Sequence, residues 1–164
     1  MATNDARPTM LDDRRLPVQA RLAAAWASFM FFYIYVDYLA LYKPGFLDDI
    51  GAGEVHGFAT GPLFVGASLT LVGISALMVA LSATLPARVN RPLNLVVAAL
   101  YLPVTIYNVS GEPLDYAYFY GLSIALESLL LLYILRSAWT WPRTSVPSMP
   151  DVDAPEESHI RTSL

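Results

Sequence analysis

The chain has no cysteine and only two histidines, His56 and His159. The missing cysteines exclude disulfides, thiol redox chemistry and cysteine-ligated metals. Two histidines cannot form a histidine-based metal centre by themselves, so we expect neither a metal nor a cofactor. The sequence also has no Ser–His pairing and no glycine-rich phosphate loop. An intramembrane enzyme therefore ranks last among the function classes, and no catalytic residue is assigned.

Charged residues are also scarce. They make up 15% of the 164 residues, whereas hydrophobic residues make up 55%. Ordinary soluble domains carry about 25% charged residues. This composition favours one membrane-embedded domain and offers nothing that would bind nucleic acid.

Long apolar runs are abundant, and there are four of them. About 20 apolar residues suffice to cross the hydrocarbon core as a helix. The spans are expected at roughly residues 18–42, 61–85, 92–109 and 115–139. We therefore predict an all-α four-transmembrane-helix bundle over residues 17–141. A polar arm, 1–16, precedes it, and a tail rich in proline, serine and acid, 142–164, follows it and is expected to be disordered.

The basic residues predict the orientation of the bundle, because lysine and arginine concentrate on the cytoplasmic side. Nine of the ten lie in the two terminal flanks or in the connection between spans two and three: Arg7, Arg14, Arg15, Arg21, Arg88, Arg91, Arg136, Arg143 and Arg161. The two remaining connections contain only Lys43. Both termini are therefore expected in the cytoplasm, with a multi-pass location in the plasma (inner) membrane.

Two connections have features of their own. The outer loop after Lys43 contains apolar residues that predict a short interfacial helix at about 46–50. The segment 86–94 is expected to be a tight inner turn. Its Arg88 and Arg91 anchor the topology and are candidates for binding anionic lipid headgroups.

Polar residues recur at helical spacing within the spans, and such residues must face protein, water or headgroups. These stripes supply the candidate ligand or proton site: Tyr33, Asp37, Tyr101, Thr105, Asn108, Tyr120, Ser123 and Glu127. Near the outer ends of the spans they predict a tyrosine-lined polar cavity that opens outward, with Glu127 at its floor. Small residues on span two (Gly66, Thr70 and Gly73) predict a face that another helix can approach closely.

The two acids of the spans each allow two main interpretations. Asp37 either ties spans one and three together at the outer rim or coordinates a ligand or cation. A snorkelling, lipid-facing Asp37 is a third possibility. Glu127 lies near the bilayer midplane, where desolvation favours the neutral acid. It is either a static hydrogen-bond donor to a span-two serine, Asn94 or Tyr101, or a group that exchanges protons and couples them to a substrate.

Two stretches carry a resemblance to a known family. They are "YIYVDYLALYKPGFLDDI", followed by a glycine-rich outer loop, and "LSATLPARVNRPLNLV". Over roughly residues 22–140 the chain resembles a group of small bacterial four-helix membrane proteins of unknown function. That resemblance implies the fold and no activity. More loosely, the outline is similar to DoxX-like four-helix proteins, although no motif supports this.

Two function hypotheses lead. In the first, a small lipophilic or cationic molecule enters the tyrosine-lined cavity and Glu127 senses or exchanges a proton. In the second, the protein is a non-catalytic membrane subunit or scaffold whose polar groups join helices, with a second copy or a membrane partner on its small-residue face. The lipid bilayer is the surrounding partner in both.

Overall fold

The chain forms a bundle of long helices in the computed structural model, which describes residues 16–55, 57–108 and 114–142. The elements in chain order are α1 (Val18–Ala40), α2 (Phe46–Gly51), β1 (Glu54–Val55), β2 (Phe58–Ala59), α3 (Pro62–Thr84), α4 (Ala87–Tyr107), the 3-10 helix η1 (Leu114–Tyr116) and α5 (Ala117–Trp139). Four helices are long and apolar enough to cross a membrane: α1, α3, α4, and η1 together with α5. The predicted all-α architecture with four spans is confirmed.

Three of the long helices begin at a proline. Pro17 and Pro86 precede the first turns of α1 and α4, and Pro62 is the first residue of α3. Proline suits this place because the first N–H groups of a helix have no partner within it and the ring presets a helical φ. Helical hydrogen bonding satisfies most of the backbone within the spans, as hydrocarbon surroundings require, but Pro92 and Pro103 inside α4 have no N–H to donate.

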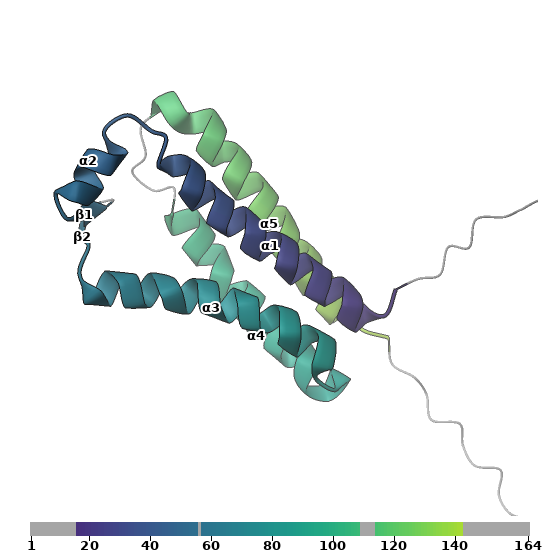
Figure 1. Cartoon of the computed structure of the whole chain (residues 1–164). Coiled ribbons are helices and arrows are strands. Elements are labelled where there is room, and N and C mark those ends of the chain that lie inside the picture. Colours follow the sequence, from purple (N-terminus) through teal and green to yellow (C-terminus); the bar gives the residue numbers. More distant parts are fainter. Residues whose placement is uncertain (1–15, 56, 109–113, 143–164) are drawn as a thin grey trace, which may run out of the picture.

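The long helices run alongside one another, and Figure 1 shows α1 and α5 side by side. Helix α1 packs along both α3 and α5, and α4 packs along α5, whereas α3 and α4 approach each other less closely. The start of α1, the end of α5 and the α3–α4 turn lie at one end of the bundle (Figure 1), here called the inner end. Helix α2 and the β1–β2 hairpin lie at the opposite, outer end. The side of the membrane that each end faces stays a prediction.

Aromatic rings fill the centre of the bundle. Trp26 and Phe29 of α1 are fully buried and meet edge to face, with ring centroids 5.7 Å apart. Tyr101 of α4 packs against both, at 5.8 Å from Trp26 and 5.3 Å from Phe29. Such edge-to-face contacts add about 0.5–1.5 kcal/mol per pair to the apolar burial. These ring contacts join α1 to α4, and α5 packs against both helices.

Helix α3 leans away from the other long helices towards its outer end (Figure 1). Its buried residues, Ser75, Met78 and Ser82, all lie in its inner half. Residues 65–70 are exposed throughout. A Cβ added at Gly66 or Gly73 would meet nothing within 4 Å. The close helix approach expected on this small-residue face is therefore not made within the described chain.

The inner turn is shorter than expected. We predicted a turn over 86–94 and a third span from residue 92, but α4 already begins at Ala87 and continues through Pro92. The expectation treated Pro92 as the first helical residue, whereas Pro86 occupies the cap. Arg88 and Arg91 therefore belong to the first turns of α4. The helix also continues through Pro103 to Tyr107.

The outer connection contains the predicted short helix, which is α2. It starts after Gly45, whose φ of +82° favours glycine, the residue without a Cβ. The hairpin that follows pairs Glu54 with Ala59 and Val55 with Phe58, and it was not predicted. Most of the predicted polar arm and tail lies outside the described residues.

Candidate functional site

Glu127 is the only acidic side chain that is buried among the described residues, and it lies near the middle of α5. Two hydroxyl groups donate hydrogen bonds to its carboxyl group. Ser123, one turn earlier on α5, donates to Oε1 at 2.9 Å. Thr105 of α4 donates to Oε2 at 3.0 Å. We call Thr105, Ser123 and Glu127 the Glu127 cluster.

The partners of Glu127 differ from those expected. The static interpretation named a span-two serine, Asn94 or Tyr101. Asn94 instead lies eleven residues before Thr105 on α4, about 16 Å away along the helix axis. It is too far towards the inner end to reach Glu127. The helical spacing had placed Thr105 and Ser123 on inward faces, but spacing along one helix does not give the axial level of its neighbour.

The pairing of Thr105 with Glu127 shows that the outer end of α4 is recessed. Thr105 lies two residues before the end of α4, whereas Glu127 lies ten residues after the start of α5. At about 1.5 Å per residue, α5 extends some 15 Å beyond Glu127 and α4 only about 3 Å beyond Thr105. The cluster is therefore deep within α5 but close to the outer end of α4.

Two further candidates lie at this recessed end. Asn108, the C-cap of α4, donates from Nδ2 to the hydroxyl of Tyr33 on α1 at 3.2 Å. Tyr33 is buried, whereas Asn108 is exposed. This bond joins α1 to α4 at the outer end of α4. Tyr101, another tyrosine of the stripes, donates instead to the carbonyl of Leu71 on α3.

Asp37 stands apart from these pairs. Its side chain is exposed, and it makes no hydrogen bond within the part of the chain that the structure describes. It nevertheless lies within electrostatic range of Glu127 and of Tyr33. At this level Tyr33 and Asn108, rather than Asp37, join α1 to α4, and the interpretations of Asp37 stay predictions.

A second polar network lies at the inner end, and its centre is the fully buried Asn94. Its Oδ1 accepts from Trp26 Nε1 at 2.7 Å and from Ser82 Oγ at 3.2 Å. Its Nδ2 donates to Asn90 Oδ1 at 2.6 Å and to the Asn90 carbonyl at 2.9 Å. This inner network of Trp26, Ser82, Asn90 and Asn94 joins α1, α3 and α4.

Asn90 is the member that sequence reasoning missed as a contact residue. Its Nδ2 donates to the carbonyl of Ser82 at 2.7 Å and, less closely, to that of Leu85 at 3.3 Å. The helical partner of the Ser82 carbonyl would be the N–H of residue 86, but residue 86 is a proline and has none. The signal in the sequence for this contact was the spacing of four residues between Pro86 and Asn90.

The only lysine of the chain, Lys43, lies among aromatic rings at the outer end. Its Nζ lies 5.4, 5.2 and 4.8 Å from the ring centroids of Phe46, Tyr116 and Tyr120. It also donates to the Tyr120 hydroxyl at 2.6 Å. Beside it is an open hollow of ≈ 280 Å³, whose lining consists of Leu39, Tyr42, Lys43, Tyr116 and Phe119.

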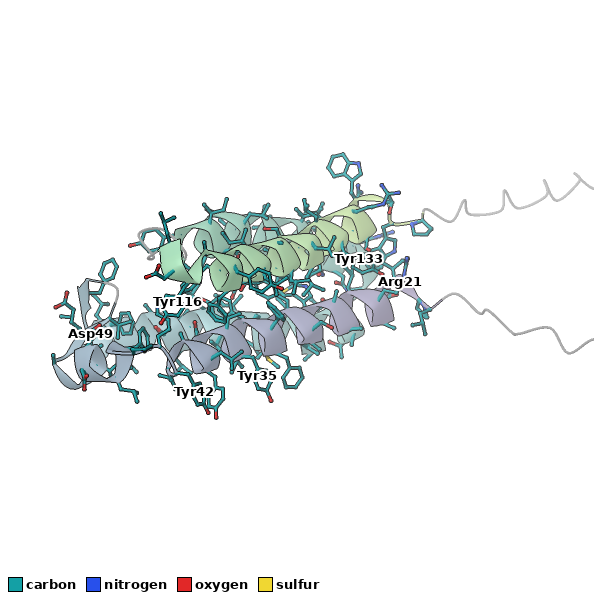
Figure 2. All side chains as sticks on the ribbon, turned by 90° about the horizontal axis from the view of Figure 1, so that it is seen from above. Arg21, Tyr35, Tyr42, Asp49, Tyr116 and Tyr133 are labelled. Carbon is teal, nitrogen blue, oxygen red and sulfur yellow. The ribbon has the colours of Figure 1, made fainter. Side chains whose placement is uncertain are left out.

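A row of tyrosines follows the outside of α1. Figure 2 shows Tyr35 and Tyr42 pointing away from α5. Tyr38 lies between them, with ring centroids 6.3 Å from Tyr35 and 5.7 Å from Tyr42. The hydroxyls of Tyr38 and Tyr42 are 2.9 Å apart, and this hydrogen bond raises the pKa of Tyr42. Exposed tyrosines at this level are typical of the aromatic belt at a membrane surface.

The two lipid-headgroup candidates have different surroundings. Arg88 is exposed, whereas Arg91 donates from Nε to the carbonyl of Ala138 at 3.2 Å. Its guanidinium group also lies 6.0 Å from the ring centroid of Trp139. Arg91 thus binds the last carbonyls of α5, a favourable place for a cation. No group of three or more histidine, aspartate or glutamate side chains forms a metal-binding arrangement within the described ranges.

Comparison with known families matches residues 12–148 to the Family of unknown function (DUF6326). The chain belongs to this family. The match covers the whole helical bundle and agrees with the resemblance to a membrane family of unknown function. The looser likeness to DoxX-like proteins is not confirmed. Neither the comparison with curated proteins nor that with solved structures gives a match.

Proposed function

We propose that this DUF6326 protein binds a small cationic molecule within its helical bundle and exchanges a proton at Glu127. The observation that carries the proposal is the pairing of the buried Glu127 carboxyl with the hydroxyls of Ser123 and Thr105. Ionisable residues inside a membrane are costly, and they generally mark substrate paths or proton relays.

The choice of partners supports proton exchange over a static role. A hydroxyl can donate to a carboxylate, and after rotation it can accept from a protonated carboxyl. Ser123 and Thr105 therefore suit both protonation states of Glu127 without movement of a helix. A buried arginine or lysine partner would instead hold the acid in its charged form. The arginines on the described helices all belong to the inner half of the bundle: Arg21, Arg88, Arg91 and Arg136.

The surroundings of Glu127 favour a cation. Asp37 is exposed and lies within electrostatic range of Glu127, so two acids act on one region of the bundle. A cation near both would relieve their mutual repulsion. Tyr33 adds an aromatic face at the same level, and aromatic faces attract cations. Helix α4 ends two residues after Thr105, so the cluster lies close to the outer end of that helix.

The test is a comparison of wild type with Glu127→Gln in lipid nanodiscs. Gln keeps the shape and can still pair with both hydroxyls, but it cannot titrate. If Glu127 exchanges protons, the difference between the two melting temperatures should change with pH between about pH 5 and pH 9. An infrared carboxyl band that responds to pH should be present in wild type and absent from the variant.

Asp48→Asn is the matched control, because Asp48 is an exposed acid on α2. It should leave both the pH dependence and the carboxyl band as in wild type. Melting curves of wild type and Glu127→Gln that stay parallel over the whole range, with no pH-dependent band, would contradict proton exchange at this position.

A further inference from the structure

The aromatic rings around Lys43 come from three separate elements: Phe46 from α2, Tyr116 from η1 and Tyr120 from α5. We call these three rings the Lys43 cage. All three centroids lie within 5.4 Å of the ammonium nitrogen, inside the range of about 6 Å over which a ring face attracts a cation. The fold therefore assembles a cation-binding arrangement and fills it with a side chain of its own.

The charges around the cage also favour cations. Five described acids lie on α1 near its end, on α2, on the hairpin or on η1: Asp37, Asp48, Asp49, Glu54 and Asp115. Lys43 is the only basic residue in these outer segments, since the chain has just one lysine and its described arginines lie on the inner half. The opposite ends are marked in Figure 2 by Asp49 and Arg21. An organic anion would meet this acidic surface unfavourably, whereas an organic cation would be attracted.

The hollow beside the cage provides space for the rest of such a molecule. It has a volume of ≈ 280 Å³, and its lining includes Lys43 and one residue of the cage, Tyr116. Leu39 and Phe119 add apolar walls. Alkyl or aryl groups attached to a cationic centre could therefore pack in the hollow while the centre itself faces the rings.

We propose that the Lys43 cage is an outer site for organic cations of the quaternary ammonium type, held in this structure by the ammonium group of Lys43. An incoming cation must displace the ammonium group of Lys43, which competes with it for the same three rings. The inference rests on the proposed function, because it names the class of molecule that reaches Glu127. Tyr120, Ser123 and Glu127 follow one face of α5, which places the cage about 10 Å above the acid.

The first test measures binding of tetrapropylammonium to the full chain in nanodiscs by calorimetry. Lys43→Met removes the competing charge and keeps most of the side-chain length. We expect it to bind the probe about tenfold more tightly than wild type, the size of a cation–π contribution of this kind. Adding Tyr116→Leu to Lys43→Met should abolish the gain. Lys43→Gln serves if the Met variant does not fold.

Arg88→Met is the matched control, since it removes an exposed cation from the opposite end of the molecule. It should bind the probe as wild type does. Unchanged or weaker binding in the folded Lys43 variants would overturn the proposal, and so would the absence of any probe binding.

The second test uses wild type alone. The chain has a single lysine, so acylation by an amine-specific reagent followed by peptide mass analysis reports on Lys43 directly. Tetrapropylammonium should accelerate acylation of Lys43, because the displaced amine becomes accessible, whereas the same concentration of sodium chloride should not. An unchanged or slower rate would show that the probe does not displace Lys43.

The outcomes separate the two proposals. Tighter binding in Lys43→Met, together with parallel pH curves for wild type and Glu127→Gln, would establish the outer site and refute proton exchange. A pH-dependent difference at Glu127 without any effect of Lys43→Met would leave the proposed function standing and refute the cage as a cation site.

Discussion

A single amide side chain, that of Asn94, joins three helices. It accepts from Trp26 of α1 and Ser82 of α3, and it donates to Asn90 of its own helix α4. Trp26 and Ser82 each donate a hydrogen bond to Asn94, and the side-chain oxygen of Asn90 accepts one from it. Without it, the Trp26 indole N–H and the Asn90 Oδ1 would be buried without partners.

We therefore expect Asn94→Ala to lower the free energy of unfolding by about 2 kcal/mol, since a buried polar group left unpaired costs about 1–3 kcal/mol. Steric trapping or denaturation in mixed micelles would measure the change. Asn108→Ala is the control. It removes an exposed amide with one 3.2 Å contact and should cost no more than about 0.6 kcal/mol, the average for such bonds in membranes. Equal losses in both variants would refute the special role of the inner network.

At the residue scale, the sequence predicted most of the side chains that face inward but not which of them meet. Six of the eight candidate residues on the polar stripes are buried, whereas Asp37 and Asn108 are exposed. Which side chains meet depends on how far the helices are shifted along one another, and helical periodicity carries no information about that shift. The same limit explains why Glu127 meets Thr105 and Ser123 rather than the partners proposed for it.

The inner ends of two helices, α3 and α5, receive hydrogen bonds from side chains of α4. The clearest case joins α4 to α5, where Arg91 donates to the carbonyl of Ala138 and lies beside the Trp139 ring. The last carbonyls of a helix have no partner within it, and a cation there also interacts favourably with the helix dipole.

We predict that Arg91→Ala destabilises the end of α5 by about 0.5–1 kcal/mol through the loss of this capping contact. Hydrogen exchange of the last turn of α5 should accelerate, and the melting temperature should fall. Arg88→Ala, on the same helix but exposed, should change neither quantity. If instead both variants respond equally, and only in anionic lipid, headgroup binding is the shared role of the two arginines.

At the element scale, the long apolar runs predicted the four spans to within a few residues, because hydrophobic length is a local property of the chain. The start of α4 was the exception. Two prolines, Pro86 and Pro92, could each begin the helix, and a proline at either position satisfies the local rule. Because α4 begins after Pro86, Asn90 lies within hydrogen-bonding distance of the Ser82 carbonyl. This contact joins α4 to α3, and rules that consider only neighbouring residues do not predict it.

The molecule as a whole carries its charges at opposite ends. The described outer segments hold five acids and one lysine, and the described arginines, Arg21, Arg88, Arg91 and Arg136, lie on the inner halves of the helices. Positive residues concentrate on the cytoplasmic side of membranes. The fold places the start of α1 and the end of α5 at one end (Figure 1), so both should face the cytoplasm.

Single cysteines can test this orientation directly, because the natural chain has none. In intact cells, a membrane-impermeant maleimide should label Asp49→Cys on α2 and should not label Arg88→Cys on α4. Permeabilised cells provide the control, in which both variants should react. Labelling of Arg88→Cys but not of Asp49→Cys in intact cells would show that the bundle is inverted.

The lean of α3 has a mechanical consequence. Its inner half is fixed by Ser82 in the inner network, whereas its outer third lies exposed. A helix of 23 residues is a rod about 35 Å long. If α3 rotates about the inner network, its outer end moves furthest. A rotation of about 5° at Ser82 would carry the outer end through roughly 3 Å, a distance that follows from the length of the rod. Small rearrangements around Asn94 would thus be amplified into a change in the spacing of the outer helix ends.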